Sequence, residues 1–101
     1  MKTLLVAAVL VVAGVSETAM AGDATAGKTK YTVCAGCHGP TGAGNEALKY
    51  PKLAGLEAGY VKQQLVAFKS GARDNATMKA MTAGLNVTDM DNLAAYIATL
   101  K

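Results

Sequence analysis

The sequence predicts a small all-α domain of three main helices joined by loops. Two segments repeat apolar residues at helical spacing, a third follows a good N-cap residue, and no run of alternating β-branched residues favours a strand. The length of 101 residues allows one domain. A hydrophobic content of 51% with a net charge of only +3 excludes a disordered chain.

The first helix is expected to run from about residue 24 to residue 37, with Asp23 as its N-cap. Residues 39–44 are rich in glycine and form a loop, and residues 45–49 are expected to form one short helical turn. Pro51 begins a further irregular stretch that extends to residue 55.

The second helix is expected from residue 57 or 58 to Ser70, with Gly71 as its C-terminal stop. Its apolar stripe consists of Tyr60, Val61, Gln64, Leu65 and Phe68. After a second loop, the third helix is expected to begin at Thr88, whose hydroxyl can cap it. Its buried face contains Met90, Leu93, Ala94, Ile97 and Leu100, with Tyr96 beside them.

The first 21 residues have the layout of a secretory signal peptide. Lys2 gives a short positive head, residues 4–15 are an apolar run, and small residues around Met20 end the segment. The apolar run is shorter than the roughly 20 residues that a membrane-spanning helix needs. We therefore expect cleavage after Ala21, with residues 22–101 as the exported domain and a retained membrane anchor as the alternative. No other run could span a membrane.

The exported domain has little side-chain volume for a core. Residues 22–101 contain 16 Val, Ile, Leu, Met and Phe residues against 15 Ala and 10 Gly. Domains of this size usually need a disulfide, a metal or another covalent or ligand-based support. Loss of Lys2 and Glu17 leaves the net charge at +3, which is too weak and scattered to predict nucleic-acid binding.

Both cysteines and the only histidine lie in the five residues Cys34-Ala35-Gly36-Cys37-His38. This spacing is the attachment pattern of c-type haem. Two thiols three residues apart on a helical turn can each form a thioether to one vinyl group at the same porphyrin edge. His38 then lies beneath the iron as an axial ligand. We expect one covalently bound haem c, which would also fill the core that the side chains leave unfilled.

Three other interpretations of the cysteines are weaker. A thioredoxin-like redox pair needs a βαβ context, and no strand is predicted. A structural zinc site needs four ligands, but the chain has only three Cys and His residues. A Cys34–Cys37 disulfide would close a very small loop and leave His38 unexplained.

With the only histidine already used, the sixth position must hold Met, Lys, Tyr, water or nothing. Methionine is favoured, because thioether sulfur is a good ligand for haem iron and raises its reduction potential. Met1 and Met20 lie in the signal segment, and Met90 lies on the packing face of the last helix. Met78 and Met81 remain. They are three residues apart and share one face of a helical turn, so spacing alone leaves both open.

The domain resembles the small mono-haem class I cytochromes c of bacteria over essentially all of residues 22–101. Gly27 and Tyr31 resemble the glycine and aromatic of the family's first helix, which cross against Leu93 and Tyr96 of the last helix. The run from Pro51 to Leu56 resembles the family's Pro-x-Leu-x-Gly-Leu loop.

The resemblance implies a class I cytochrome c fold, with helices and loops wrapped around the haem. It also implies that the Pro51 carbonyl accepts the free ring N–H of His38. In the family's nearest bacterial members the ligand lies about seven residues before a leucine like Leu85, which favours Met78 as the axial ligand and makes Met81 the second choice. No proline flanks Met78, unlike in the wider family.

The expected function is one-electron transfer in the periplasm by a monomeric carrier that is not itself an enzyme. The alternatives are a gas-binding or peroxidatic protein with an open sixth position and a haem subunit dedicated to one redox enzyme. Expected partners are redox proteins that dock transiently at the exposed haem edge. The exposed haem edge is expected near Cys34 and Cys37, and its rim is expected to include Ala35 and Gly36, with Lys28, Lys79 or Gly84 beside them. Candidate partners of the haem propionates are Arg73, Lys52, Tyr50 and Tyr60.

Overall fold

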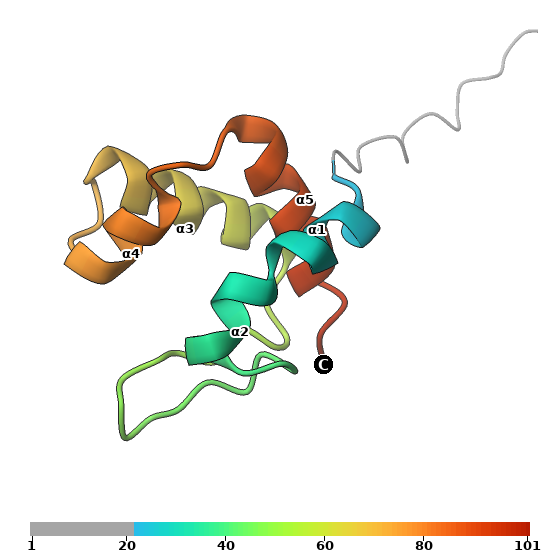
Figure 1. Ribbon diagram of the computed structural model, residues 1–101, viewed down its shortest axis with the longest axis horizontal. Helices are drawn as coiled ribbons and strands as arrows, with labels where there is room; N and C mark the ends of the chain where they lie inside the picture. Colours follow the sequence, from blue (N-terminus) through green and yellow to red (C-terminus); the bar gives the residue numbers. More distant parts are fainter. Residues whose placement is uncertain (1–21) are drawn as a thin grey trace, which may run out of the picture.

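The computed structural model describes residues 22–101, which form five helices and no strand (Figure 1). The predicted signal segment, residues 1–21, lies outside the described residues. The helices are α1 (Ala24–Lys30), α2 (Thr32–His38), α3 (Ala58–Ser70), α4 (Ala76–Thr82) and α5 (Val87–Ile97). The predicted all-α class is confirmed.

The predicted first helix is divided at Tyr31 into α1 and α2. The Tyr31 carbonyl accepts hydrogen bonds from both Cys34 N and Ala35 N, so the backbone is tightened at this point. The Tyr31 side chain is buried, its hydroxyl donates to the Gly39 carbonyl at 2.8 Å, and its ring centroid lies 5.3 Å from that of Tyr96. These long-range contacts of Tyr31 accompany the break, and periodicity in the sequence does not show them. The predicted cap, Asp23, accepts from Thr25 N and Ala26 N.

The prediction for α3 is confirmed, including its end at Gly71, whose φ of 87° lies in the left-handed region. Residues 46–49 form a tight turn, in which Leu48 N donates to the Asn45 carbonyl and Lys49 N to the Glu46 carbonyl, as in the single helical turn predicted here. Asn45 and Tyr50 pair across it as an isolated antiparallel bridge. Helix α4 was not among the three predicted main helices. It begins after Asn75, whose side chain accepts from Met78 N at 2.9 Å.

The last helix begins at Val87, one residue before the predicted start, and its cap is Asn86 instead of the predicted Thr88. Asn86 caps α5 by accepting from Asp89 N, and Asp89 in turn accepts from Asn86 N, which makes a reciprocal capping box. This arrangement satisfies two backbone donors. Asp91, which stands three residues after Thr88, instead pairs with Lys62 of α3. The helix ends at Ile97, so Leu100 of the predicted buried face follows the helix and packs against the core from there.

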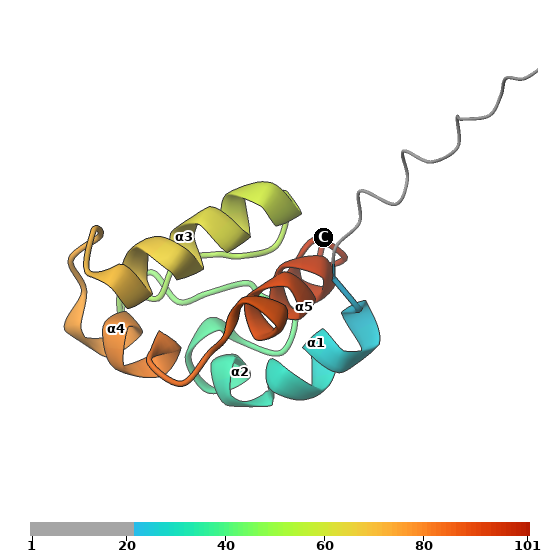
Figure 2. The ribbon, with the colours of Figure 1, turned by 90° about the horizontal axis from the view of Figure 1, so that it is seen from above.

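Helix α5 lies between α1 and α3, as the view from above shows (Figure 2). Helix α4 packs against α3 and α2 follows α1. The core cluster consists of Tyr31, Val61, Leu65, Met90, Leu93, Ala94 and Ile97. Met90 is buried there, as predicted.

The crossing of α1 and α5 requires glycine at position 27. A Cβ atom there would lie 1.9 Å from the Asn92 carbonyl oxygen and 2.9 Å from the Tyr96 Cβ. The resemblance correctly predicted that Gly27 and Tyr31 cross against the last helix, but Asn92 was not expected at the contact. Two ion pairs also involve α5, Lys30–Asp89 at 3.5 Å and Lys62–Asp91 at 2.8 Å. In residues 22–101, no helix is long and apolar enough to cross a membrane.

Candidate functional site

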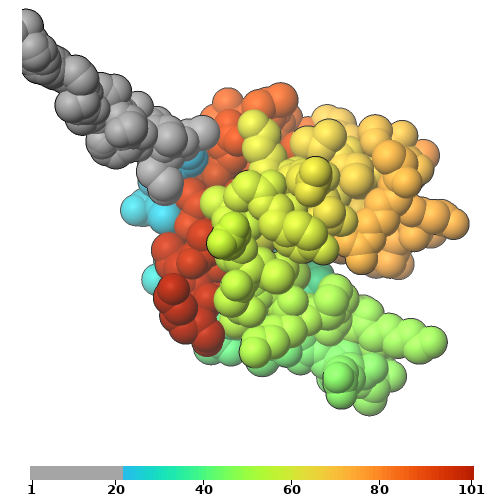
Figure 3. All heavy atoms as spheres, turned by 180° about the vertical axis from the view of Figure 1, so that it is seen from behind, coloured from blue at the N-terminus to red at the C-terminus, as the bar shows by residue number. Residues whose placement is uncertain are grey.

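A cavity of ≈ 410 Å³ lies between α2, α3, α4 and the loop that follows α2. The space-filling view shows an indentation there, between the gold and orange residues of α3 and α4 and the green residues of the loop (Figure 3). The wall that α3 and α5 contribute is mostly apolar and contains Val61, Leu65, Phe68, Leu93 and Ile97. A second cavity, of ≈ 260 Å³, shares Cys34, His38, Pro51 and Met78 with the first.

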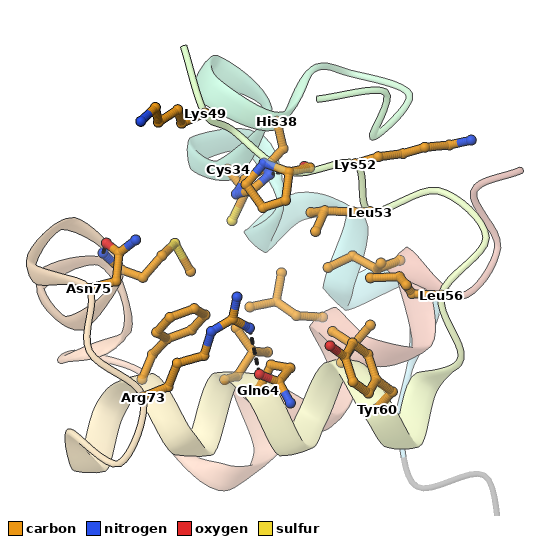
Figure 4. A pocket seen from close by; sticks show the side chains of 17 residues that line it. Cys34, His38, Lys49, Lys52, Leu53, Leu56, Tyr60, Gln64, Arg73 and Asn75 are labelled. Atoms are coloured by element: carbon orange, nitrogen blue, oxygen red, sulfur yellow. Dashed lines mark hydrogen bonds between the residues drawn. The ribbon is translucent and has the colours of Figure 1, made fainter. Parts of the chain in front are cut away.

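His38 is the last residue of α2 and is buried, with 8% of its surface exposed. Its ring Nδ1 lies 2.9 Å from the Pro51 carbonyl oxygen. Because a carbonyl oxygen only accepts, Nδ1 carries the proton and Nε2 carries a lone pair. His38 lines both cavities, and Figure 4 shows it at the edge of the larger one. The structure thus contains a buried imidazole that is held at one nitrogen and has a basic second nitrogen.

Cys34 and Cys37 lie on α2 as free thiols, the first half-buried and the second exposed. Cys34 lines both cavities and Cys37 lines the smaller one. Burial raises the pKa of the Cys34 thiol, and the neighbouring Cys37 raises it further. A reactive redox thiol needs a lowered pKa, so this environment does not favour the thioredoxin-like alternative. The described residues also contain no group of three potential ligands that could hold a metal ion by themselves.

Met78 and Met81 differ in position, although both belong to α4. Met78 lines both cavities and packs against the core cluster. Met81 is 44% exposed and lines only the smaller cavity. Helices α2 and α4 do not pack against each other, and His38 and Met78 approach the same cavity from these two helices.

The Cytochrome c family profile matches residues 24–101, which is most of the chain and includes every residue of this site. The chain belongs to the cytochrome c family. Cytochromes of this family bind c-type haem covalently and carry electrons, and an electron-transfer role fits this chain. The predicted resemblance is therefore confirmed.

Cytochrome c-554(547) from Halothiobacillus neapolitanus is 50% identical over 95 residues, which cover 80% of this chain and all of that protein. A thiosulfate dehydrogenase electron acceptor from Stutzerimonas stutzeri is 43% identical over 66% of this chain and 31% of its own length. Among solved structures, reduced cytochrome c4 from Pseudomonas stutzeri matches with a TM-score of 0.73 at 32% identity, over 83% of this chain and 50% of that one. The chain thus spans half or less of the latter two relatives.

The residues of the cytochrome site fit a covalent haem. The free thiol of Cys37 directly precedes the buried His38, and that of Cys34 lies one helical turn before it. His38 is held at Nδ1 by the Pro51 carbonyl, and the lining of the mostly apolar cavity contains no second histidine. The chemistry of this donor set suits haem iron, for which imidazole and thioether are both good ligands.

The four candidate propionate partners all lie around the cytochrome site. Arg73, Lys52 and Tyr60 line the larger cavity, whereas Tyr50 lines the smaller one, with its ring centroid 6.5 Å from that of His38. Arg73 is held in two ways: its guanidinium donates to the Gln64 side chain and lies 4.6 Å from the centroid of the Phe68 ring (Figure 4). Gln64 belongs to the predicted stripe of the second helix, and its contact with Arg73, nine residues further on, is not evident from the sequence.

The predicted docking rim lies outside the linings of both cavities. Ala35, Gly36, Lys28, Lys79 and Gly84 line neither of them, and Ala35 is half-buried against the core. The exposed apolar residues beside the smaller cavity are instead Val33, Leu48 and Met81. The sequence does not show that these three residues share one surface, because Leu48 lies in an irregular loop whose path cannot be predicted from periodicity.

Proposed function

We propose that this cytochrome is a periplasmic one-electron carrier in which Cys34 and Cys37 hold one haem c and His38 and Met78 are its axial ligands. The observation that carries the proposal is the shared cavity, into which α2 contributes His38 and Cys34 while α4 contributes Met78. We propose residues 22–101 as the mature, monomeric protein, with export directed by residues 1–21. It would transfer electrons and catalyse no reaction of its own.

Each side chain has a distinct task in this proposal. The Pro51 carbonyl fixes the tautomer of His38 and raises the basicity of Nε2. The Met78 thioether favours the ferrous state. Bound haem supplies the one-electron couple between ferric and ferrous iron. The apolar wall from α3 and α5 excludes water from the ring and also favours the less charged state.

The small apolar patch of Val33, Leu48 and Met81 supports transient docking of a redox partner near Cys37. An interface of this kind would be small and would exchange rapidly. We propose this patch in place of the expected rim of Ala35 and Gly36 with Lys28, Lys79 or Gly84, because those residues lie outside both cavity linings.

The optical spectrum of the exported protein tests the proposal. We expect a low-spin c-type spectrum, a ferric sulfur-to-iron charge-transfer band and no change when carbon monoxide is added to the reduced protein. A shift with carbon monoxide would indicate an open sixth position and favour the gas-binding or peroxidatic alternative. Absence of haem would favour the alternatives in which Cys34 and Cys37 are a redox thiol pair or a disulfide.

A dedicated haem subunit is the second candidate, and one observation favours it. The Stutzerimonas relative is named as the electron acceptor of a thiosulfate dehydrogenase, although this chain spans only 31% of it. The two candidates share the same haem chemistry. Co-purification with one dehydrogenase at a fixed ratio would favour the subunit, and reduction by several unrelated donors would favour the general carrier.

Replacement of Arg73 tests the assignment of the propionate partners. We expect Arg73→Gln to lower the reduction potential by roughly tens of millivolts, because a nearby positive charge favours the less positive ferrous site. Arg73→Lys keeps the charge and should change the potential less. Lys28→Gln removes one charge from α1 outside the cavity linings and is the control for net charge. If Arg73→Gln and Lys28→Gln lowered the reduction potential equally, Arg73 would not be a propionate partner.

A further inference from the structure

Thr82, the last residue of α4, is buried, and among residues 22–101 only His38 and the tyrosine Tyr31 also bury a polar side-chain group in this way. Only 1% of its surface is exposed. Its hydroxyl donates to the Met78 carbonyl at 2.8 Å and approaches the Lys79 carbonyl at 3.3 Å. A buried hydroxyl that lost these acceptors would pay the full cost of its desolvation. As long as Thr82 stays buried, its hydroxyl therefore needs the Met78 carbonyl as an acceptor.

The other peptide group of Met78 is also held by a side chain. The Met78 N–H donates to the Asn75 side chain at 2.9 Å, so side chains contact the backbone both before and after the Met78 Cα. Helix α4 has seven residues, too few for a stable isolated helix. The position of Met78 must then come from such contacts and from packing on α3.

Thr82 also connects α4 to α3. Its carbonyl accepts from Leu85 N at 3.0 Å, and the Leu85 carbonyl accepts from the Lys69 ammonium group of α3. A chain of hydrogen bonds therefore runs from Met78 through Thr82 and Leu85 to Lys69. It joins the short helix that carries the methionine to the longest helix of the domain.

We propose that Thr82 is a positioning residue that, together with Asn75, sets the Met78 sulfur against the haem iron and determines how firmly it stays bound. The inference rests on the proposed function, because it takes Met78 as the axial ligand. A threonine hydroxyl that bonds back to a helix carbonyl is common and has little effect when exposed. Thr82 differs because it is buried and because the carbonyl that it contacts belongs to the ligand residue.

The test measures how readily imidazole displaces the methionine from the ferric holoprotein. Thr82→Val keeps the side-chain shape and removes the hydroxyl. We expect the imidazole concentration at half-displacement, followed by loss of the charge-transfer band, to fall about fivefold, the effect of one ordinary hydrogen bond. Thr82→Ser restores the hydroxyl and should return the value to within about twofold of wild type.

Thr99→Val is the matched control, since the Thr99 hydroxyl donates to the Tyr96 carbonyl at 2.6 Å in an exposed position outside both cavities. It should leave the imidazole concentration at half-displacement unchanged.

If Thr82→Val does not yield holoprotein, Asn75→Ala is measured instead, and the imidazole concentration at half-displacement should again fall. Unchanged displacement in whichever of these two variants yields holoprotein overturns the inference, and so does a loss that Thr82→Ser fails to restore. Met78→Ala, measured in parallel, separates the two proposals: if it keeps the band, the axial assignment is wrong, whereas if it loses the band and Thr82→Val is normal, only the positioning role is wrong.

Discussion

Met78→Ala should convert the ferric iron from low-spin to high-spin and abolish the sulfur-to-iron charge-transfer band. Alanine cannot coordinate, so water or no ligand would occupy the sixth position. Loss of the thioether should lower the reduction potential by on the order of a tenth of a volt or more, since axial ligands set haem potentials over a wide range. The reduced variant should also bind carbon monoxide. Optical spectra and a redox titration measure all three changes.

Met81→Ala is the control on the same helix. Met81 is 44% exposed and lines only the smaller cavity, so this change should leave the band and the potential nearly unchanged. The opposite pair of results would transfer the ligand role to Met81. If both variants kept the band, neither methionine would be the ligand and the proposed axial set would be wrong.

Gly27→Ala should destabilise the holoprotein by roughly 3 kcal/mol, the upper end for an over-packed site. The added Cβ would lie 1.9 Å from the Asn92 carbonyl oxygen, which is backbone and cannot rotate away. Helices α1 and α5 would have to separate. For a domain of this size, the loss corresponds to a fall in Tm of roughly 10 to 20 °C. Thermal and denaturant unfolding of the holoprotein measure it.

Gly59→Ala is the matched control. Gly59 lies in α3, and a Cβ there would meet no atom within 4 Å. Alanine is the better helix former, so this variant should be as stable as wild type or up to about 1 kcal/mol more stable. Similar stabilities for Gly27→Ala and Gly59→Ala would mean that the crossing of α1 and α5 does not require glycine at position 27.

Much of this fold could be predicted from local sequence. Helix α3 was predicted in full because its stripe is continuous and Gly71 gives an unambiguous end. The start of the last helix is less certain from sequence, because capping-box spacing occurs twice, at Asn86 with Asp89 and at Thr88 with Asp91, and only the structure shows that Asn86 is the cap. Helix α4 was harder to predict, because seven residues carry too little periodicity to separate a helix from a loop.

The sequence by itself determined the chemistry of this cytochrome. The thiols and imidazole of Cys34, Cys37 and His38 are adjacent along the chain, so their spacing alone predicts covalent haem attachment. Only the tertiary structure decided which distant groups meet that motif. The contact of Arg73 with Gln64, the burial of Thr82 and the different exposures of Met78 and Met81 depend on how α3, α4 and α5 pack. The physical reason is that attachment chemistry depends on covalent neighbours, whereas burial and distance depend on elements that only the folded chain brings together.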